Sequence, residues 1–301
     1  MFFHQPGEQS ALSNDTDTPE PGVYPDVPFA EYLAWNACNN SKLGQALRSP
    51  RHYYCQPPRA DRPTFQLGRL VHAGKLQPET LLNDYIVLPD LTDGIGGTRP
   101  TATKKYKERL QEFRDAHASK ELVTPEQYAV LQGTLASLAC HERAAHYFGQ
   151  PAATEVSILW RDQDTDLLCK ARLDHWSEQA ARITDLKTTD DASHFIRSIR
   201  RYDYARQAAF YIDGTAAATG VVAEFCLVAV EKDPPYGVRA APLSGADVRR
   251  GREEYKRALA AIAEGGRALA EGKLPPSYGD PDVWRTDDRC RIRIGGKWVQ
   301  L

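Results

Sequence analysis

The sequence of 301 residues predicts an α/β fold with a central mixed sheet flanked by helices. Three observations support this prediction. Helix-type patterns dominate before residue 150, three β-rich segments with short turns follow, and a helix-type segment separates the third of these from a fourth. We expect the three consecutive strands to form an antiparallel meander, whereas the crossover helix lets the fourth strand lie parallel to one of them.

The N-terminal part is expected to be a loose tail followed by a helical region. Residues 1–28 hold five prolines and show little periodicity, which is typical of a flexible tail. A helix is predicted to begin near Ser41 and to end before Pro50, because the residue before a proline avoids the helical conformation. Further helices are predicted over 65–77, 104–118 and 125–147, with a glycine-rich loop over 89–103 and Thr124 as the N-cap of the last helix.

The C-terminal half carries the β-rich segments. The alternation of apolar residues predicts strands over 153–160, 167–176, 182–187, 221–230 and 238–242, and helices over 190–217 and 245–271. The stretch after Pro275 is polar and irregular. We therefore expect one domain over 29–272, made of a helical part (29–150) and a catalytic core (151–272), with tails over 1–28 and 273–301.

Composition excludes several classes of protein. Lys and Arg total 38 against 40 Asp and Glu, so the net charge of −2 excludes a globally basic protein that coats nucleic acid, but not a locally basic groove. No run of apolar residues approaches the length of about 18 that a membrane span needs. The first residues also lack the basic and apolar regions of a secretory signal. We expect a cytoplasmic protein with no membrane partner. The six cysteines form no CxxC pair, so we expect idle thiols and not a zinc or iron–sulfur site.

The segment Asp185-Leu186-Lys187 is the first candidate for chemistry. Residues two apart in a strand share a face, so Asp185 and Lys187 lie side by side while Leu186 faces the opposite layer. A hairpin of the predicted length brings Asp174 next to Asp185. Two adjacent carboxylates repel unless a cation lies between them, and oxygen ligands favour Mg²⁺ or Mn²⁺. Lys187 would then orient or help to deprotonate a metal-bound water, or stabilise the charge of a phosphorane-like transition state.

Each of these residues also has a plainer interpretation. Asp185 and Lys187 alone would be read as a surface salt bridge, and a lone helical histidine such as His72 is more often a structural residue. Gln207 and Tyr211, four apart on one helix, could simply be a partly buried polar pair. The constellation of these residues with Glu155 and Asp174 is what favours a metal site.

Several arginines are candidates for contacts with DNA. Four of them lie close in sequence to a single acid, Asp203: Arg197, Arg200, Arg201 and Arg206. These arginines either contact the phosphates of DNA or form an ordinary solvated helix face. Arg48 and Arg51 beside the first predicted helix are candidates for binding a terminal phosphate, with ordinary surface charge as the alternative.

These motifs resemble the PD-(D/E)xK nuclease superfamily, whose core is restriction-endonuclease-like. The pattern of Gly68 to His72, Glu155, Asp174, Asp185-x-Lys187 and Gln207 to Tyr211 is similar to the RecB-type branch. The stretches GVYPDVPFAEYLAWNACNNSKLGQALRSPRHYY, FQLGRLVHAGKLQPE and EVSILWRDQDTDLLCKARLDHWSEQAARITDLKTTDDASHFIRSIRRYDYARQAAFYIDG more closely resemble the nuclease domain of the exonuclease VIII (RecE-type) phage recombination exonucleases, over about residues 22–235. One departure is Leu173, where the superfamily has proline before the aspartate.

The resemblance implies roles for individual residues. It implies one or two Mg²⁺ ions, with Mn²⁺ as a substitute, held by His72, Asp174, Asp185 and the backbone carbonyl of Leu186, with Glu155 bound directly or through water. It also implies that Lys187 acts on the attacking water, and that Gln207 and Tyr211 line the site and touch DNA.

The resemblance also implies an activity and partners. It implies 5′→3′ degradation of linear double-stranded DNA from its ends, in a bacterial or phage-infected cytoplasm, leaving 3′ single strands for an annealing protein. It further implies a ring-shaped homo-oligomer. The alternatives are a RecB-like single-strand exonuclease, an endonuclease, and a non-catalytic DNA-binding module.

Overall fold

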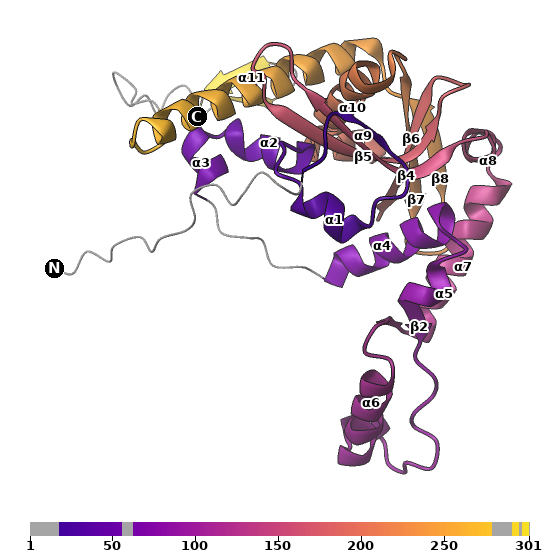
Figure 1. Cartoon of the computed structure of the whole chain (residues 1–301). Helices are drawn as coiled ribbons and strands as arrows, with labels where there is room; N and C mark the ends of the chain where they lie inside the picture. Colours follow the sequence, from indigo (N-terminus) through magenta and orange to yellow (C-terminus); the bar gives the residue numbers. More distant parts are fainter. Residues whose placement is uncertain (1–17, 56–62, 279–290, 295–296, 301) are drawn as a thin grey trace.

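The computed structural model describes residues 18–55, 63–278, 291–294 and 297–300, and its centre is a six-stranded sheet between two layers of helices (Figure 1). Neighbouring strands lie in the order β1 (Gly22–Tyr24), β4 (Ala153–Arg161), β5 (Leu168–Ser177), β6 (Arg182–Thr189), β7 (Glu224–Glu231) and β8 (Val238–Pro242). In this sheet β6 and β7 pair in parallel and the other neighbours are antiparallel. The predicted meander and its parallel fourth strand are therefore confirmed.

Strand β7 is buried on both faces, because helices cover each of them. Phe225, Leu227 and Ala229 face one layer, while Cys226 and Val228 face the other. This explains why its sequence is a continuous apolar run, the pattern expected of a strand that is buried on both sides.

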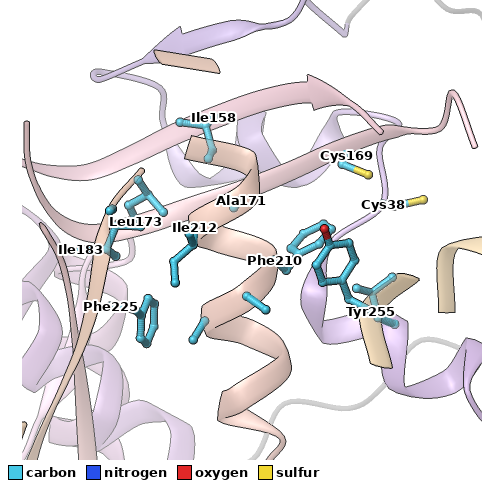
Figure 2. Close-up of a cluster of buried hydrophobic side chains, with 14 of the residues drawn as sticks. Cys38, Ile158, Cys169, Ala171, Leu173, Ile183, Phe210, Ile212, Phe225 and Tyr255 are labelled. Atoms are coloured by element: carbon cyan, nitrogen blue, oxygen red, sulfur yellow. The ribbon is translucent and has the colours of Figure 1, made fainter. Parts of the chain in front are cut away.

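One face of the sheet carries the larger core. Helices α2 (Asn40–Ala46), α9 (Phe195–Arg201), α10 (Tyr204–Thr219) and α11 (Gly245–Ala270) contribute to this layer. Figure 2 shows Phe210 and Ile212 of α10 between the strands and α11, whose Tyr255 packs edge-on against Phe210. Gly251 lets α11 cross α10 closely, since a Cβ there would lie 2.0 Å from the carbonyl oxygen of Ala205.

The opposite face of the sheet is covered by helices α4 (Pro63–Leu76), α7 (Pro125–Cys140) and α8 (Glu142–Phe148). Leu70 and Val71 of α4 share a core with Leu186 of β6. Thr124 caps α7 in a capping box with Gln127, as its position before Pro125 predicts. The helices of the N-terminal half are thus built onto the strands of the C-terminal half.

A protruding segment follows α4. It leaves the body through α5 (Leu81–Asp84) and β2 (Tyr85–Val87), runs through a loop to α6 (Lys104–Ala116), and returns through β3 (Glu121–Val123). Figure 1 shows α6 standing apart from the rest of the molecule. Strands β2 and β3 pair in parallel at its base. Only the loop and α6 were predicted for this segment.

Two predicted helices are each broken into two. The helix expected over 125–147 is interrupted at His141, whose extended backbone and side-chain nitrogen cap α8. The helix expected over 190–217 is interrupted at Asp203, which adopts the left-handed conformation that Asp tolerates better than most residues. In both places a polar side chain permits a change of direction that apolar periodicity does not reveal.

The expectations for the chain ends need correction. Gly22–Tyr24 pair with β4 as strand β1, so the predicted tail is wrong for this part, and residues 1–17 lie outside the described residues. The first predicted helix is capped by Asn39 and not by Ser41; short helices lie on either side of it, α1 (Phe29–Ala34) and α3 (Pro50–Tyr54). The irregular end contains a hairpin of β9 (Arg291–Ile294) and β10 (Lys297–Gln300). No helix among the described residues is long and apolar enough to span a membrane.

Candidate active site

Strand β5 alternates charged and apolar residues although it lies within the sheet. Lys170, Arg172 and Asp174 occupy every second position, and the residues between them are apolar and buried. The ladder between β5 and β6 runs from Ser177 to His175, so the next facing pair in register is Asp174 with Asp185. Beyond the ladder, Asp174 Oδ2 accepts a hydrogen bond of 2.8 Å from the backbone N–H of Leu186. The predicted approach of the two aspartates is confirmed.

Asp185 is held by side chains from two elements. It is 1% exposed, its Oδ1 accepts a 2.7 Å hydrogen bond from Gln207 Nε2, and its Oδ2 forms an ion pair with the Lys187 ammonium. The same ammonium lies 5.2 Å from the centre of the Tyr204 ring. Asp185 and Lys187 therefore share one face of β6, as their spacing predicts, and that face is the one that α10 covers.

The charges in this cluster shift one another's pKa. Burial and the neighbouring Asp185 carboxylate raise the pKa of Asp174 to about 7. Burial opposes the charged form of Lys187, but Asp185 and Asp174 outweigh it and raise the pKa of the lysine above its usual value. A cluster of this kind disfavours two free carboxylates and keeps Lys187 as an ammonium.

His72 completes a set of possible metal ligands. It comes from α4, and its Nδ1 lies 3.5 Å from Asp174 Oδ2. Ligand atoms of His72, Glu155 and Asp174 all lie within 4.8 Å of one another. Gly68, one turn earlier on the same face of α4, would carry its Cβ 3.5 Å from Thr188 Oγ1, so the helix passes close to the end of β6. The sequence-predicted ligands from α4, β4 and β5 are therefore brought together.

Glu155 occupies an unusual place in β4. Its φ of 53° is left-handed, and the ladder to β5 is interrupted where Glu155 would face Asp174. This conformation costs a non-glycine residue roughly 1–2 kcal/mol. Arg172 Nε donates a 2.7 Å hydrogen bond to Glu155 Oε2, and its Nη1 donates to the carbonyl of Val27. The strained backbone and this arginine together direct the Glu155 carboxylate toward Asp174.

These residues line a cleft of about 560 Å³. Of the side chains that were predicted to ligate metal or act in catalysis, six line this cleft: His72, Glu155, Asp174, Lys187, Gln207 and Tyr211. The exception is Asp185, which lies behind Lys187 and Gln207. A larger hollow of about 1270 Å³ between α9 and β8 contains none of the predicted site residues. The cleft is therefore the candidate active site.

Two functional neighbours were not predicted. Arg172 fixes Glu155, and Lys170 fixes the helix that borders the cleft. Lys170 Nζ donates to the carbonyls of Tyr32 at 2.7 Å, Leu33 at 3.1 Å and Trp35 at 2.7 Å, at the C-terminal end of α1. The alternation of charge along β5 was the signal in the sequence that could have identified both residues.

The arginines predicted to contact DNA occupy different environments. Arg206 is buried and bonds to Asp203 and Asn40, so its predicted role at a DNA surface is wrong. Arg48 and Arg51 contact the segment around Pro275 and Tyr278 and lie outside the cleft lining. The remaining three arginines are exposed on α9, and their contact with DNA stays a prediction: Arg197, Arg200 and Arg201.

Comparisons with known proteins place this geometry in a family. A family model described as "PDDEXK-like domain of unknown function (DUF3799)" matches residues 32–276. The comparison with curated proteins gave no match. Among solved structures, the chain is similar to one described as "Putative exonuclease" from Eubacterium rectale, with a TM-score of 0.43 and 10% identity over 74% of this chain and 90% of that chain. It is also similar to SSO0001, with a TM-score of 0.24 and 17% identity over 63% and 85% of the two chains.

Proposed function

Because the chain belongs to the DUF3799 family of PDDEXK-like domains, we propose that it is a divalent-metal-dependent nuclease that hydrolyses phosphodiester bonds of DNA. The observation that carries this proposal is the convergence of His72, Glu155 and Asp174 within 4.8 Å, in a cleft that also holds Lys187. The family supports a nuclease at the level of its fold. The chemistry of the cluster supports it at the level of the side chains.

The residues of the cluster fit a hard divalent cation. One imidazole and two carboxylates offer nitrogen and oxygen ligands, which suit Mg²⁺ or Mn²⁺ better than a thiolate-preferring ion. Burial, the Asp185 carboxylate and, to a smaller extent, the Glu155 carboxylate raise the pKa of Asp174, so a cation beside these carboxylates would stabilise their ionised forms. The backbone N–H of Leu186 points to Asp174, and the carbonyl of Leu186 lies on the same side of the strand. This supports the expected role of the Leu186 carbonyl as a metal ligand. We assign His72, Glu155 and Asp174 as side-chain ligands, with Asp185 beside them.

A bound ion would lower the pKa of its water ligand and offset the negative charge of the phosphate. Lys187 remains an ammonium at neutral pH, so its Nζ donates hydrogen bonds and does not accept a proton. We assign it to orienting the attacking water and to holding a phosphate oxygen as charge develops there. This differs from a lysine that would deprotonate the water.

Gln207 and Tyr211 complete the site from α10. Gln207 Nε2 fixes the Asp185 carboxylate, which in turn holds Lys187. Burial raises the pKa of Tyr211, so its hydroxyl keeps its proton and can donate to a phosphate oxygen. Gln207 therefore acts as a positioning residue for Asp185, and we assign Tyr211 to donating a hydrogen bond to the substrate.

The finer activity is part of the same proposal. We propose 5′→3′ digestion of linear duplex from its ends, which would supply 3′ single strands to an annealing protein, and a ring-shaped homo-oligomer as the working form. The similarity of residues 22–235 to the exonuclease VIII type supports both.

The experiment that tests the proposal uses linear duplex labelled at either the 5′ or the 3′ end, with Mg²⁺ or with EDTA. We expect loss of the 5′ label in Mg²⁺ only, and no digestion of a covalently closed circle. Digestion of the circle would indicate an endonuclease, and preference for single strands would indicate the RecB-like alternative. Binding without release of nucleotides in any metal would overturn the nuclease proposal in favour of a binding module.

A further inference from the structure

The segment that protrudes after α4 is anchored at both ends. We call residues 88–120 the arm. Strands β2 and β3 at its base pair in parallel, from Tyr85 with Glu121 to Val87 with Val123. The Leu88 N–H donates to the carbonyl of Val123 at 2.8 Å. The arm thus leaves and re-enters the body at one place, and Figure 1 shows the rest of it projecting away.

The arm has its own internal packing. Arg109 of α6 donates hydrogen bonds to the carbonyls of Leu91 at 3.0 Å and Asp93 at 2.6 Å, in the loop between β2 and α6. Half-buried apolar or aromatic side chains lie both in the loop and on α6, among them Leu91, Ile95, Tyr106, Leu110 and Phe113. The hydrogen bonds of Arg109 tie the loop to the helix, so the backbone that carries the side chains at the end of the arm has a defined position.

The end of the arm carries only positive charge. Residues 94–107 contain no Asp or Glu, and four cations stand exposed there: Arg99, Lys104, Lys105 and Lys107. We call these four residues the cationic tip. Three of them lie in the first turn of α6, where the helix dipole favours acids and disfavours cations. Lys104 forms a 3.5 Å ion pair with Glu108, an exposed pair of small energetic value. This arrangement costs stability unless an anion binds it.

The base of the arm borders the cleft. Asp84 and Tyr85, which lie just before the arm, line the same cleft as His72 and Asp174. Helix α6 has 13 residues, so it separates the cationic tip from the base by about 20 Å at 1.5 Å per residue. This span corresponds to about six base pairs at 3.4 Å each. A duplex that enters the cleft past Tyr85 and runs parallel to α6 would meet the cationic tip after this distance.

We propose that the cationic tip binds phosphates of duplex DNA about six base pairs from the cleft, so that the arm holds the substrate at a second place. The proposal rests on the nuclease function for the nature of the ligand. The arm would raise affinity for long duplex without taking part in hydrolysis. Its contribution would be electrostatic, so it should weaken with salt and be independent of sequence.

The test compares two triple variants that lose the same charge. The arm variant is Arg99→Gln, Lys105→Gln and Lys107→Gln; the control variant is Arg249→Gln, Arg257→Gln and Arg267→Gln, three exposed arginines of α11 on the other side of the sheet. Binding of a 30-base-pair duplex and of a hairpin with a three-base-pair stem, about 10 Å long and too short to reach from the cleft to the cationic tip, is measured in EDTA over a series of salt concentrations. Thermal unfolding confirms that both variants are folded.

We expect the arm variant to bind the long duplex about tenfold more weakly than the control, with a salt slope reduced by two to three, since each phosphate contact contributes about 0.9. The short hairpin should bind equally to both variants. Equal binding of the long duplex, or an equal defect on the hairpin, would overturn the proposal. The readout needs no hydrolysis: a chain that binds through the arm but never cuts would overturn the nuclease function alone.

Discussion

The Gln207 side chain of α10 donates a 2.7 Å hydrogen bond to the Asp185 carboxylate of β6. Both groups are almost fully buried, and the other carboxylate oxygen is paired with Lys187. The helix that covers the sheet therefore sets the orientation of Asp185 and, through it, of the lysine. The roles proposed for these residues can be tested separately.

Replacing Gln207 should weaken catalysis without unfolding the chain. In Gln207→Leu the Asp185 oxygen loses its donor, and we expect a 10- to 100-fold loss of Mg²⁺ affinity or of hydrolysis rate, typical of residues that orient metal-site carboxylates. Titration of the hydrolysis rate with Mg²⁺ measures this. Thr219→Ala, at the far end of the same helix, should leave both quantities unchanged. Full activity of Gln207→Leu at low Mg²⁺ would contradict the positioning role.

Replacing Lys187 should remove hydrolysis but keep DNA binding. Loss of a preorganised donor to developing charge costs about 100- to 1000-fold in rate, and we expect at least this for Lys187→Gln. Binding of duplex in EDTA should stay within about threefold of the parent, because phosphate contacts elsewhere dominate affinity. The matched control is Lys232→Gln, which breaks a surface ion pair with Asp190. Wild-type rates in Lys187→Gln would refute its assignment.

The metal-free protein should lose stability as the pH rises toward neutrality. The pKa of Asp174 is about 7 in the folded chain, against 3.8 for an ordinary aspartate in the unfolded chain. As the pH rises, the unfolded chain therefore loses the proton of Asp174 at a lower pH than the folded chain does. The contribution of protonated Asp174 to the free energy of unfolding is fully present below about pH 4 and is lost as the pH rises through about 7. The loss is a few kcal/mol at most, since one pKa unit corresponds to about 1.4 kcal/mol.

Added Mg²⁺ should oppose that loss. We expect Mg²⁺ to raise the melting temperature at pH 8 and to have little effect at pH 5, because an ion binds the ionised carboxylates. Asp174→Asn should remove both the pH dependence and most of the Mg²⁺ effect. Melting curves with and without Mg²⁺ across this range test it, and a Mg²⁺ effect that is equal at both pH values would count against the proposed ligands.

Lys170→Met should destabilise the helix that borders the cleft. The substitution removes the lysine donor from three carbonyls at the end of α1, of which that of Trp35 also accepts from the N–H of Ala37, and we expect the lost bonds together to cost about 2–4 kcal/mol. The free energy of unfolding from a denaturant titration measures this loss. Lys42→Met, at an exposed position of α2, should change stability by less than about 0.5 kcal/mol. Equal stability of the two variants would mean that the carbonyls find other partners.

Gly251→Ala should be much more harmful than an alanine in an open loop. A Cβ at Gly251 would lie 2.0 Å from a backbone carbonyl of α10, so the two helices must separate, at a cost of about 1–3 kcal/mol or more. Gly96→Ala in the arm, where nothing lies within 4 Å, should be neutral. Differential scanning calorimetry of the two variants makes the comparison. A neutral Gly251→Ala would show that the crossing can relax freely.

The strand periods made much of the site predictable. Because Asp185 and Lys187 are two apart, their shared face followed from the sequence, and the hairpin length placed Asp174 beside them. The family confirms the resemblance to the PD-(D/E)xK superfamily, while the closer likeness to exonuclease VIII and the ring remain predictions.

Other features depend on contacts that no local pattern encodes. Arg206 was expected at a surface, but its partner Asn40 lies on a distant segment, so its burial depends on the packing of α2 against α10. The break at Asp203 depends on one left-handed residue within an apolar pattern that reads as continuous. Strand β1 has three residues and acquires its structure only by pairing with β4.

The shared core of α4 and β6 has a practical consequence for engineering. His72 precedes the hairpin of β4 and β5, whereas its partner Asp174 lies in the second strand of that hairpin, so two polypeptides divided near residue 150 would each hold an incomplete ligand set. Neither half would cleave alone, and activity would return only on reassembly. The molecule thus offers a natural position for a split reporter whose signal depends on two fused proteins meeting.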